Sequence, residues 1–254
     1  MKTATASLFI VVLVGQSWAP CLAITNLFHR VSVSAATVSA SQRLEVAPES
    51  FSNIKSSIIC SLREWCDLWC HDQTTDQCFY SDLIVMPGYS EPNLADALTC
   101  YTRRHPDFAT GAVIEGTEVH PVYAGVREKS NLVDGIYDRK SMSQCFDPNE
   151  LNDPWFMLDF RAPVTFRLVK FFAQPGGAAF MINRISNLEL RVSVSPAATP
   201  GDFSAFLVFG FFTGPAIAGQ EIIVEGASPV TARFVTVQKM GLTTNFQLCH
   251  IEVY

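Results

Sequence analysis

The chain has few charged residues and no excess of basic ones. Lys and Arg number 18 against 24 Asp and Glu among 254 residues, which gives a formal net charge of -6. A nucleic-acid-binding protein needs a basic stripe that displaces counterions from phosphates, so this composition argues against a nucleic-acid partner. The sequence also lacks any Asn-x-Ser/Thr sequon, and N-glycosylation is therefore not expected.

Recognisable catalytic signatures are also missing. The sequence contains no HExxH, GxSxG, Walker A or GxGxxG motif, and its five histidines show no ligand spacing. Asp159, within the run WFMLDF, has no second carboxylate at a defined offset. We therefore expect a binding protein rather than an enzyme.

Only one apolar run has the character of a targeting segment, and it is at the start. A lysine, an apolar stretch from Leu8 to Val14 and small residues before Ile24 predict a secretory signal peptide over residues 1–23. We prefer cleavage after Ala23, with Ala19 as the second choice. Every later run is too short to cross a bilayer, and FLVFGFF indicates a buried strand. The protein is expected to be secreted and extracellular, without a transmembrane segment.

Export places the cysteines in an oxidising compartment, which favours disulfides over metal ligands or nucleophiles. Removal of the signal peptide takes away Cys21. Seven cysteines remain: Cys60, Cys66, Cys70, Cys78, Cys100, Cys145 and Cys249. Because seven is odd, one cysteine remains either as a free thiol or as the partner in an inter-chain disulfide.

A short amphipathic helix is predicted around the first cysteines. Ser61 and Glu64 have the spacing of a capping box, and apolar residues recur at steps of three and four between 58 and 69. Cys66 and Cys70 would then share one helix face, too far apart for an unstrained disulfide. Each must reach a different element.

This arrangement resembles a PAN/Apple module, in which a helix with Cys-x-x-x-Cys is stapled to a small antiparallel sheet. The resemblance implies the pairs Cys70–Cys78 and Cys66–Cys100. It leaves Cys60 as the odd thiol, from which we expect a disulfide-linked dimer. The alternative is an unclassified small disulfide-stapled domain.

Short strands between Gly- and Pro-containing turns fill the second half of the chain, as in TFRLVKFFA, NLELRVSVS and EIIVEG. Such a series predicts an antiparallel β-sandwich or jelly roll, with the N-terminal part as a small α+β domain. We divide the chain into a signal peptide (1–23), a leader that adds at most one strand (24–44), the PAN/Apple-like module (45–103) and the sandwich (104–254). A polar junction at 103–107 marks the boundary.

Five landmarks in order make the second half resemble an F-type lectin, or fucolectin, of the discoidin-like (galactose-binding-like) fold. They are NLVDGIYD, QCFDPNELNDPWFMLDF, TFRLVKFF, NRISNLELRVSVS and the closing ARFVTVQKMG with FQLCHIEVY. The resemblance implies a disulfide between Cys145 and Cys249. This bond also follows from the closing strand, which would tie the end of the sandwich to its start.

The sugar-binding residues that the same resemblance implies are only partly present in this sequence. F-type lectins hold fucose with one His and two Arg, and here the second Arg is Arg184. The first Arg falls on Gly177 and the His on Asp147, so two of the three donors are absent. Replacement groups near that rim are Asn149, Asn152, Asn183 and the backbone of the Gly176–Gly177 loop. A structural salt bridge from Arg184 to Glu189 or Asp147 is the alternative interpretation.

A calcium site is implied by the family as well. Asp134 matches its Asp, and carbonyls near Gln144 would complete the site, but His250 replaces the family's Glu. Imidazole is a poor ligand for a cation that prefers oxygen. The alternative is that Asp134 forms a turn before Gly135 and binds no metal.

The leading hypothesis is thus a secreted, lectin-like protein that recognises glycans, with a role in innate immunity. The competing hypothesis is an extracellular protein- or lipid-interaction module for adhesion that has lost sugar binding. The missing His and first Arg favour the second hypothesis.

Overall fold

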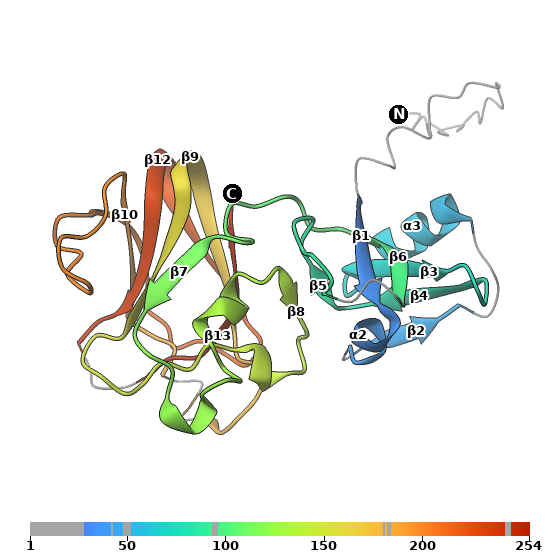
Figure 1. Cartoon of the computed structure of the whole chain (residues 1–254), viewed down its shortest axis with the longest axis horizontal. Coiled ribbons are helices and arrows are strands. Elements are labelled where there is room, and N and C mark those ends of the chain that lie inside the picture. The colour runs from blue at the N-terminus through green and yellow to red at the C-terminus, as the bar shows by residue number, and fades with distance from the viewer. Residues whose placement is uncertain are drawn as a thin grey trace, which may run out of the picture.

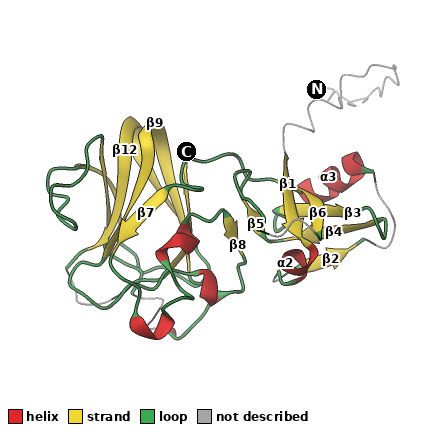
Figure 2. Ribbon diagram, viewed as in Figure 1, coloured by secondary structure: helices red, strands yellow, loops and turns green. Residues whose placement is uncertain are grey.

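A computed structural model describes residues 28–41, 43–47, 52–92, 96–179, 181, 184–241 and 245–254. The fold is mainly β, with antiparallel strands in a five-stranded sheet, a six-stranded sheet and a two-stranded sheet (Figures 1 and 2). The expected fold class is therefore confirmed. The predicted signal peptide, over residues 1–23, lies outside the described residues.

The N-terminal sheet has the strand order β1-β6-β3-β4-β2. Its strands are β1 (His29–Ser34), β2 (Leu44–Val46), β3 (Leu68–Asp72), β4 (Gln77–Ser81) and β6 (Ala97–Thr102). The expected leader thus contributes a strand, because β1 pairs along its full length with β6. Two helices accompany the sheet, α2 (Ala35–Ser39) and α3 (Asn53–Ser61).

The prediction of a helix between residues 58 and 69 is wrong. Helix α3 begins after Ser52, whose hydroxyl accepts a hydrogen bond from the Lys55 amide, and it ends at Ser61. Trp69 instead lies in β3, where its ring stacks on Tyr101 of β6 at 4.3 Å between centroids. Cross-strand packing of these large rings outweighs the helical periodicity of the sequence.

The disulfides of this region differ from those implied by the PAN/Apple resemblance. Cys60 is bonded to Cys66, which closes the C-terminal end of α3, and Cys70 is bonded to Cys100, directly opposite in the β3–β6 ladder. The pairs Cys66–Cys100 and Cys70–Cys78 are therefore wrong. The predicted inter-chain disulfide through Cys60 is also wrong, because Cys60 is bonded to Cys66 of the same chain. Cys78 is buried, and its Sγ accepts a hydrogen bond from the Ser56 hydroxyl at 3.4 Å.

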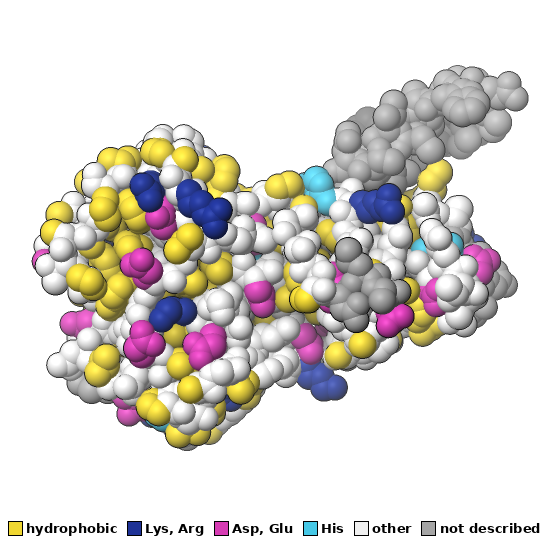
Figure 3. All heavy atoms as spheres, viewed as in Figure 1, with side chains coloured by type: hydrophobic (Ala, Val, Ile, Leu, Met, Phe, Trp, Pro, Cys, Tyr) yellow, Lys and Arg dark blue, Asp and Glu magenta, His cyan; other side chains and the backbone are white. Residues whose placement is uncertain are grey.

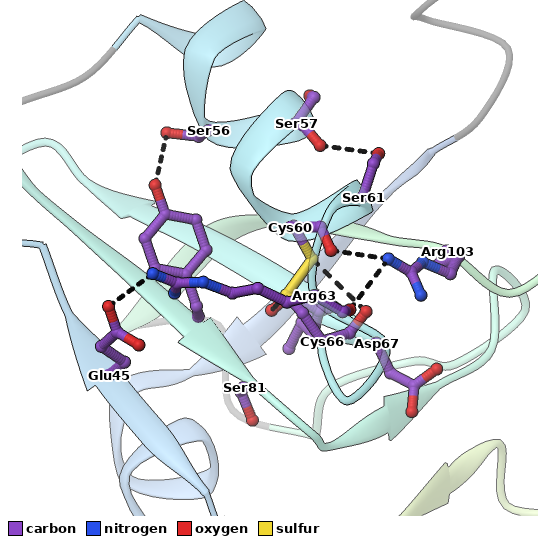
Figure 4. Close-up of a disulfide and its surroundings, with 12 residues drawn as sticks. Glu45, Ser56, Ser57, Cys60, Ser61, Arg63, Cys66, Asp67, Ser81 and Arg103 are labelled. Atoms are coloured by element: carbon purple, nitrogen blue, oxygen red, sulfur yellow. Dashed lines mark hydrogen bonds and ion pairs between the residues drawn. A yellow bond between two sulfur atoms is a disulfide. The ribbon is translucent and has the colours of Figure 1, made fainter.

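An arginine reinforces the turn that Cys60 and Cys66 close (Figure 4). Arg103 Nη2 donates to the carbonyl oxygens of Cys60, at 2.6 Å, and Arg63, at 3.3 Å. Each of these carbonyls also accepts a hydrogen bond from a backbone amide, that of Arg63 at 3.1 Å and that of Cys66 at 3.0 Å, so Arg103 adds a second, charged donor to both. The C-terminal end of α3 is thus fixed by both a covalent bond and a charged donor.

The C-terminal sheet has the order β11-β10-β12-β9-β13, with β7 paired to β9. Its strands are β7 (Val113–Gly116), β9 (Trp155–Ala173), β10 (Leu188–Ser193), β11 (Leu207–Phe212), β12 (Glu221–Lys239) and β13 (Leu248–Val253). Two register shifts divide the β9–β12 pairing into three stretches, with the longer ones at the two ends of each strand. A side-chain atom added at Gly210 of β11 would lie 2.5 Å from Val224 of β12, so β11 packs closely over that part of β12.

The core of this sandwich is apolar and rich in phenylalanine. Phe146, Phe156, Phe166, Phe171 and Phe246 are among its fully or almost fully buried side chains. Cys145 is bonded to Cys249, as predicted, and the adjacent residues Phe146 and Leu248 form a β-bridge. The bond spans 104 residues of sequence and ties the start of the sandwich to its last strand.

The two larger sheets meet along a seam that combines a buried apolar cluster, which includes Ile84, Met86, Tyr137 and Phe172, with charged contacts. Strand β5 (Ile84–Val85) pairs with β8 (Ile136–Tyr137), and the Met86 amide donates to the Gly135 carbonyl at 2.8 Å. Asp67, just before β3, accepts from Arg139 at 2.8 Å. Three short 3-10 helices, at Pro121–Tyr123, Lys129–Leu132 and Met142–Gln144, lie in the segment between β7 and β9.

The surface carries both signs of charge. On the face drawn in Figure 3, Lys and Arg side chains alternate with Asp and Glu, and hydrophobic side chains are exposed in several places over the sandwich. Among the described residues, no helix is long and apolar enough to cross a membrane.

Candidate functional site

Asp147 is the centre of a buried polar network next to the Cys145–Cys249 bond. Its side chain is fully buried and accepts hydrogen bonds from Arg127 Nη1 at 2.9 Å, from Asn245 Nδ2 at 2.7 Å and from Gln247 Nε2. Burial raises the pKa of the Asp147 carboxyl, while the bonds from Arg127 and Gln247 act to lower it. Asp147 is thus a structural residue of this end of the sandwich and does not line the surface as a ligand-binding group would.

Arg184 is connected to this network through Asn245. Arg184 Nη1 donates to Asn245 Oδ1 at 2.7 Å and to Glu150 Oε1 at 3.1 Å, and its side chain is 30% exposed. The sequence alternative of a salt bridge to Glu189 or Asp147 is wrong, because Glu150 is the acidic partner and Glu189 pairs with Arg191. The guanidinium is therefore held at the surface in a defined orientation.

A buried lysine fixes the backbone behind Arg184. Lys239 Nζ donates to the carbonyl of Arg184 and, at 3.0 Å, to that of Ser186. Burial lowers the pKa of this amine, and the charge of Arg184 adds to the effect. A Lys within the apolar strand FVTVQK was a visible signal in the sequence, but its partners are 53 and 55 residues away.

The loop at Gly177 lies over an unsatisfied amide. Gln174 is fully buried, and neither of its side-chain polar atoms has a hydrogen-bond partner among the described residues. Gly177 has a φ of +113°, and a side chain there would come within 3.1 Å of Gln174 Nε2. Buried polar groups are normally paired, so this amide is an exception within the core of the sandwich.

The other predicted ligand-binding residues have different surroundings. Asn149 Oδ1 accepts from the Glu150 backbone amide at 3.0 Å, while the Asn149 backbone amide donates to the Glu118 carbonyl at 2.8 Å. Asn152 is exposed on the same segment. Asn183 lies outside the described residues. The structure thus joins Arg184 and Asp147 in one network and gives Asn149 a local role in the turn.

The side chains of Asp134 and Gln144 make hydrogen bonds within their own loop. Asp134 Oδ1 accepts from the Ile136 amide at 3.0 Å, and Gln144 Oε1 accepts from the Asp138 amide. His250 is fully buried against the rings of Tyr137 and Phe172. The described residues include no group of three or more His, Cys, Asp or Glu side chains able to hold a metal ion. These side chains fit a turn-forming role for Asp134 better than metal binding.

Comparisons with known proteins give neither a family nor an identity. No protein-family profile matches the chain, and no curated protein matches it either. Solved structures with a similar fold include an F-lectin (fucolectin) from striped bass (Morone saxatilis) serum, at 20% identity and a TM-score of 0.49. The match covers 58% of this chain and 47% of the bass protein, less than half its length.

Two further sugar-binding modules of known structure are also similar to the chain. The lectin domain of lectinolysin, solved with Lewis B antigen, is 18% identical with a TM-score of 0.44, and the match covers 58% of this chain and 95% of that one. A Streptococcus pneumoniae fucose binding module is 16% identical with a TM-score of 0.45, covering 58% and 94%. Likeness at these values does not assign a ligand to this chain.

Proposed function

We propose that this chain is a secreted binding protein that recognises glycans at the Arg184 end of its C-terminal sandwich. The orientation of Arg184 carries the proposal. Its guanidinium is partly exposed, while Asn245 and Glu150 hold it in place and Lys239 fixes the backbone behind it. A donor whose geometry is set before binding loses little conformational entropy when a ligand arrives.

The sequence landmarks of the second half, which resemble those of F-type lectins, also support a polar ligand at this end. A charge-assisted hydrogen bond contributes roughly 1.5 to 3 kcal/mol, so Arg184 alone supports weak binding. Display of several copies would compensate, since linked sites gain avidity without new contacts.

The direct test is a glycan array probed with the mature protein and with its Arg184→Ala variant, with calcium and with a chelator. Arg167→Ala is the matched control, because Arg167 is an exposed arginine of the same sandwich that pairs with Glu225. Binding that is lost in Arg184→Ala and kept in Arg167→Ala supports the proposal. An array on which the mature protein binds no glycan in either condition refutes it.

The second candidate is an extracellular interaction module for a protein or lipid ligand. The burial of Asp147 favours it, because the position expected to present a sugar-binding His holds a structural carboxylate. It predicts ligand capture that is unchanged in Arg184→Ala.

We further propose that the chain works as two modules with a boundary near residue 104. Residues 104–254 would form the binding module, and the small disulfide-stapled module before it would include β1 as well as residues 45–103. An innate immune role and an extracellular location remain parts of this proposal, and the three disulfides are consistent with an oxidising compartment.

A further inference from the structure

A hollow of about 310 Å³ lies where β10 begins and β11 ends, beside the segment that carries Arg184. Its walls include Asn187, Glu189, Phe211, Phe212, Thr213 and Met240. Phe211 is 60% exposed and Met240 is 37% exposed, which is unusual for large apolar side chains that share one hollow. No residue of the network around Arg184 and Asp147 lines it.

The backbone around this hollow is tied together by hydrogen bonds. The Asn187 amide donates to the Thr213 carbonyl at 3.2 Å, and the Met240 amide donates to the Asn187 carbonyl at 2.9 Å. Asn187 itself has a φ of +52°, the left-handed conformation that Asn tolerates better than most residues. Three chain segments thus meet at Asn187, and the walls of the hollow are formed before any ligand binds.

The hollow is lined by both apolar and polar side chains. Phe211 stands opposite Glu189 in the β10–β11 ladder and gives the hollow an exposed aromatic ring. The side chains of Asn187 and Thr213 are exposed at the rim and bring an amide and a hydroxyl. Glu189 is the one charged lining residue, and its carboxylate is already paired with Arg191.

We propose that this hollow is a second subsite of the glycan-binding site and takes a pyranose ring. The apolar C–H face of such a ring would lie on Phe211 and Met240, while its hydroxyls would meet the Asn187 amide and the Thr213 hydroxyl. A purely apolar ligand would leave those two polar groups without partners, and a charged ligand would find no free counter-charge on the lining residues. This inference rests on the proposed function and specifies that the ligand is an oligosaccharide.

Arg184 and the hollow at Asn187 are close enough along the chain for one ligand to contact both. Asn187 lies three positions after Arg184, and an extended chain advances at most about 3.6 Å per residue, so their α-carbons are at most about 11 Å apart. The sugar unit on Arg184 and the unit in the hollow would then belong to one glycan.

The test compares an oligosaccharide found on the array with the methyl glycoside of its terminal sugar, by titration against three variants. Phe211→Ala should weaken oligosaccharide binding about tenfold and leave the methyl glycoside unchanged. Arg184→Ala should weaken both ligands. Leu207→Ala is the matched control, since Leu207 is 74% exposed on the same strand but does not line the hollow, and it should change neither. Phe211→Tyr should retain binding because it keeps the ring.

Equal affinities in wild type, Phe211→Ala and Leu207→Ala would overturn the subsite while leaving the proposed function intact. A wild-type protein that binds no glycan would overturn both. If Phe211→Ala and Leu207→Ala instead abolish a dimer seen by sedimentation and leave glycan affinity unchanged, the surface is an interface between copies and the inference is wrong. Thermal denaturation of each variant verifies that all of them are folded.

Discussion

Arg184 donates a hydrogen bond of 2.7 Å to Asn245, and the same Asn245 side chain donates one of 2.7 Å to the buried Asp147. One amide therefore links a surface cation to the polar network beside the Cys145–Cys249 bond. Its Oδ1 accepts the bond from Arg184, and its Nδ2 donates the bond to Asp147. The amide of Asn245 supplies both an acceptor and a donor, which a carboxylate at this position could not.

Replacement of Asn245 by Ala should affect both stability and binding. It leaves a buried oxygen of Asp147 without one partner, which costs about 1 to 3 kcal/mol, and it releases Arg184 from its anchor. We expect a lower midpoint in urea denaturation together with weaker glycan binding. Asn149→Ala is the control, and we expect it to change the midpoint much less. A variant that loses stability but binds as tightly as wild type would show that Asn245 does not position Arg184.

Arg104 joins the two sides of the seam. Its guanidinium lies 3.2 Å from Asp67, 3.4 Å from the fully buried Glu252 and 3.9 Å from Glu221. Removal of one partner from a buried ion cluster leaves an uncompensated charge and typically costs 3 to 5 kcal/mol. Arg104→Met should therefore destabilise the protein by about that amount in guanidinium denaturation.

The double variant Arg104→Met/Glu252→Gln should recover part of this loss, because it removes the carboxylate that Arg104→Met leaves unpaired. Glu252→Gln retains an acceptor for the Tyr254 hydroxyl, which donates to Glu252 at 3.0 Å. A loss below about 1 kcal/mol in the single variant would show that the seam depends on other contacts.

His250 should make the protein less stable in mild acid. Burial lowers the pKa of His250 to about 4 from an ordinary value of 6.5, and the charge of Arg104 adds to this, while Asp107 opposes it. Between pH 6.5 and 4 the unfolded chain binds the proton more readily than the folded one. Stability should thus fall by up to about 3 kcal/mol as the pH drops through this window. His250→Phe, which packs against Tyr137 and Phe172, should remove that dependence in thermal melts.

Asp134 should have the opposite pH dependence and make the protein less stable as the pH rises. Burial raises the pKa of its carboxyl to about 7 from 3.8, so the folded chain holds a proton that the unfolded chain has lost. The contribution of Asp134 to stability is full below pH 3.8 and is lost as the pH rises to 7, by up to about 4 kcal/mol. Asp134→Asn keeps an oxygen for the Ile136 amide and should be more stable than wild type at pH 8 but not at pH 4. Equal stability of the two proteins at pH 8 would contradict this explanation.

Sequence patterns predicted features whose causes are local. The closing strand β13 follows from a strand-like run near the end of the chain. The Cys145–Cys249 bond joins residues 104 apart and was predicted from that strand and from the resemblance to F-type lectins. The helix through Trp69 was predicted wrongly because its true partners, such as Tyr101, are distant in the sequence. Asp147 is the same case: its partners Arg127 and Gln247 lie 20 and 100 residues away, and nothing near it in the sequence shows that it is buried.

The most direct test of glycan recognition at Arg184 is the affinity of the mature protein for an array-selected glycan, measured in parallel for Arg184→Ala and Arg167→Ala. Loss of a charge-assisted hydrogen bond predicts a decrease of about tenfold to a hundredfold for Arg184→Ala, with no change for Arg167→Ala. Equal affinities for all three proteins would contradict the account.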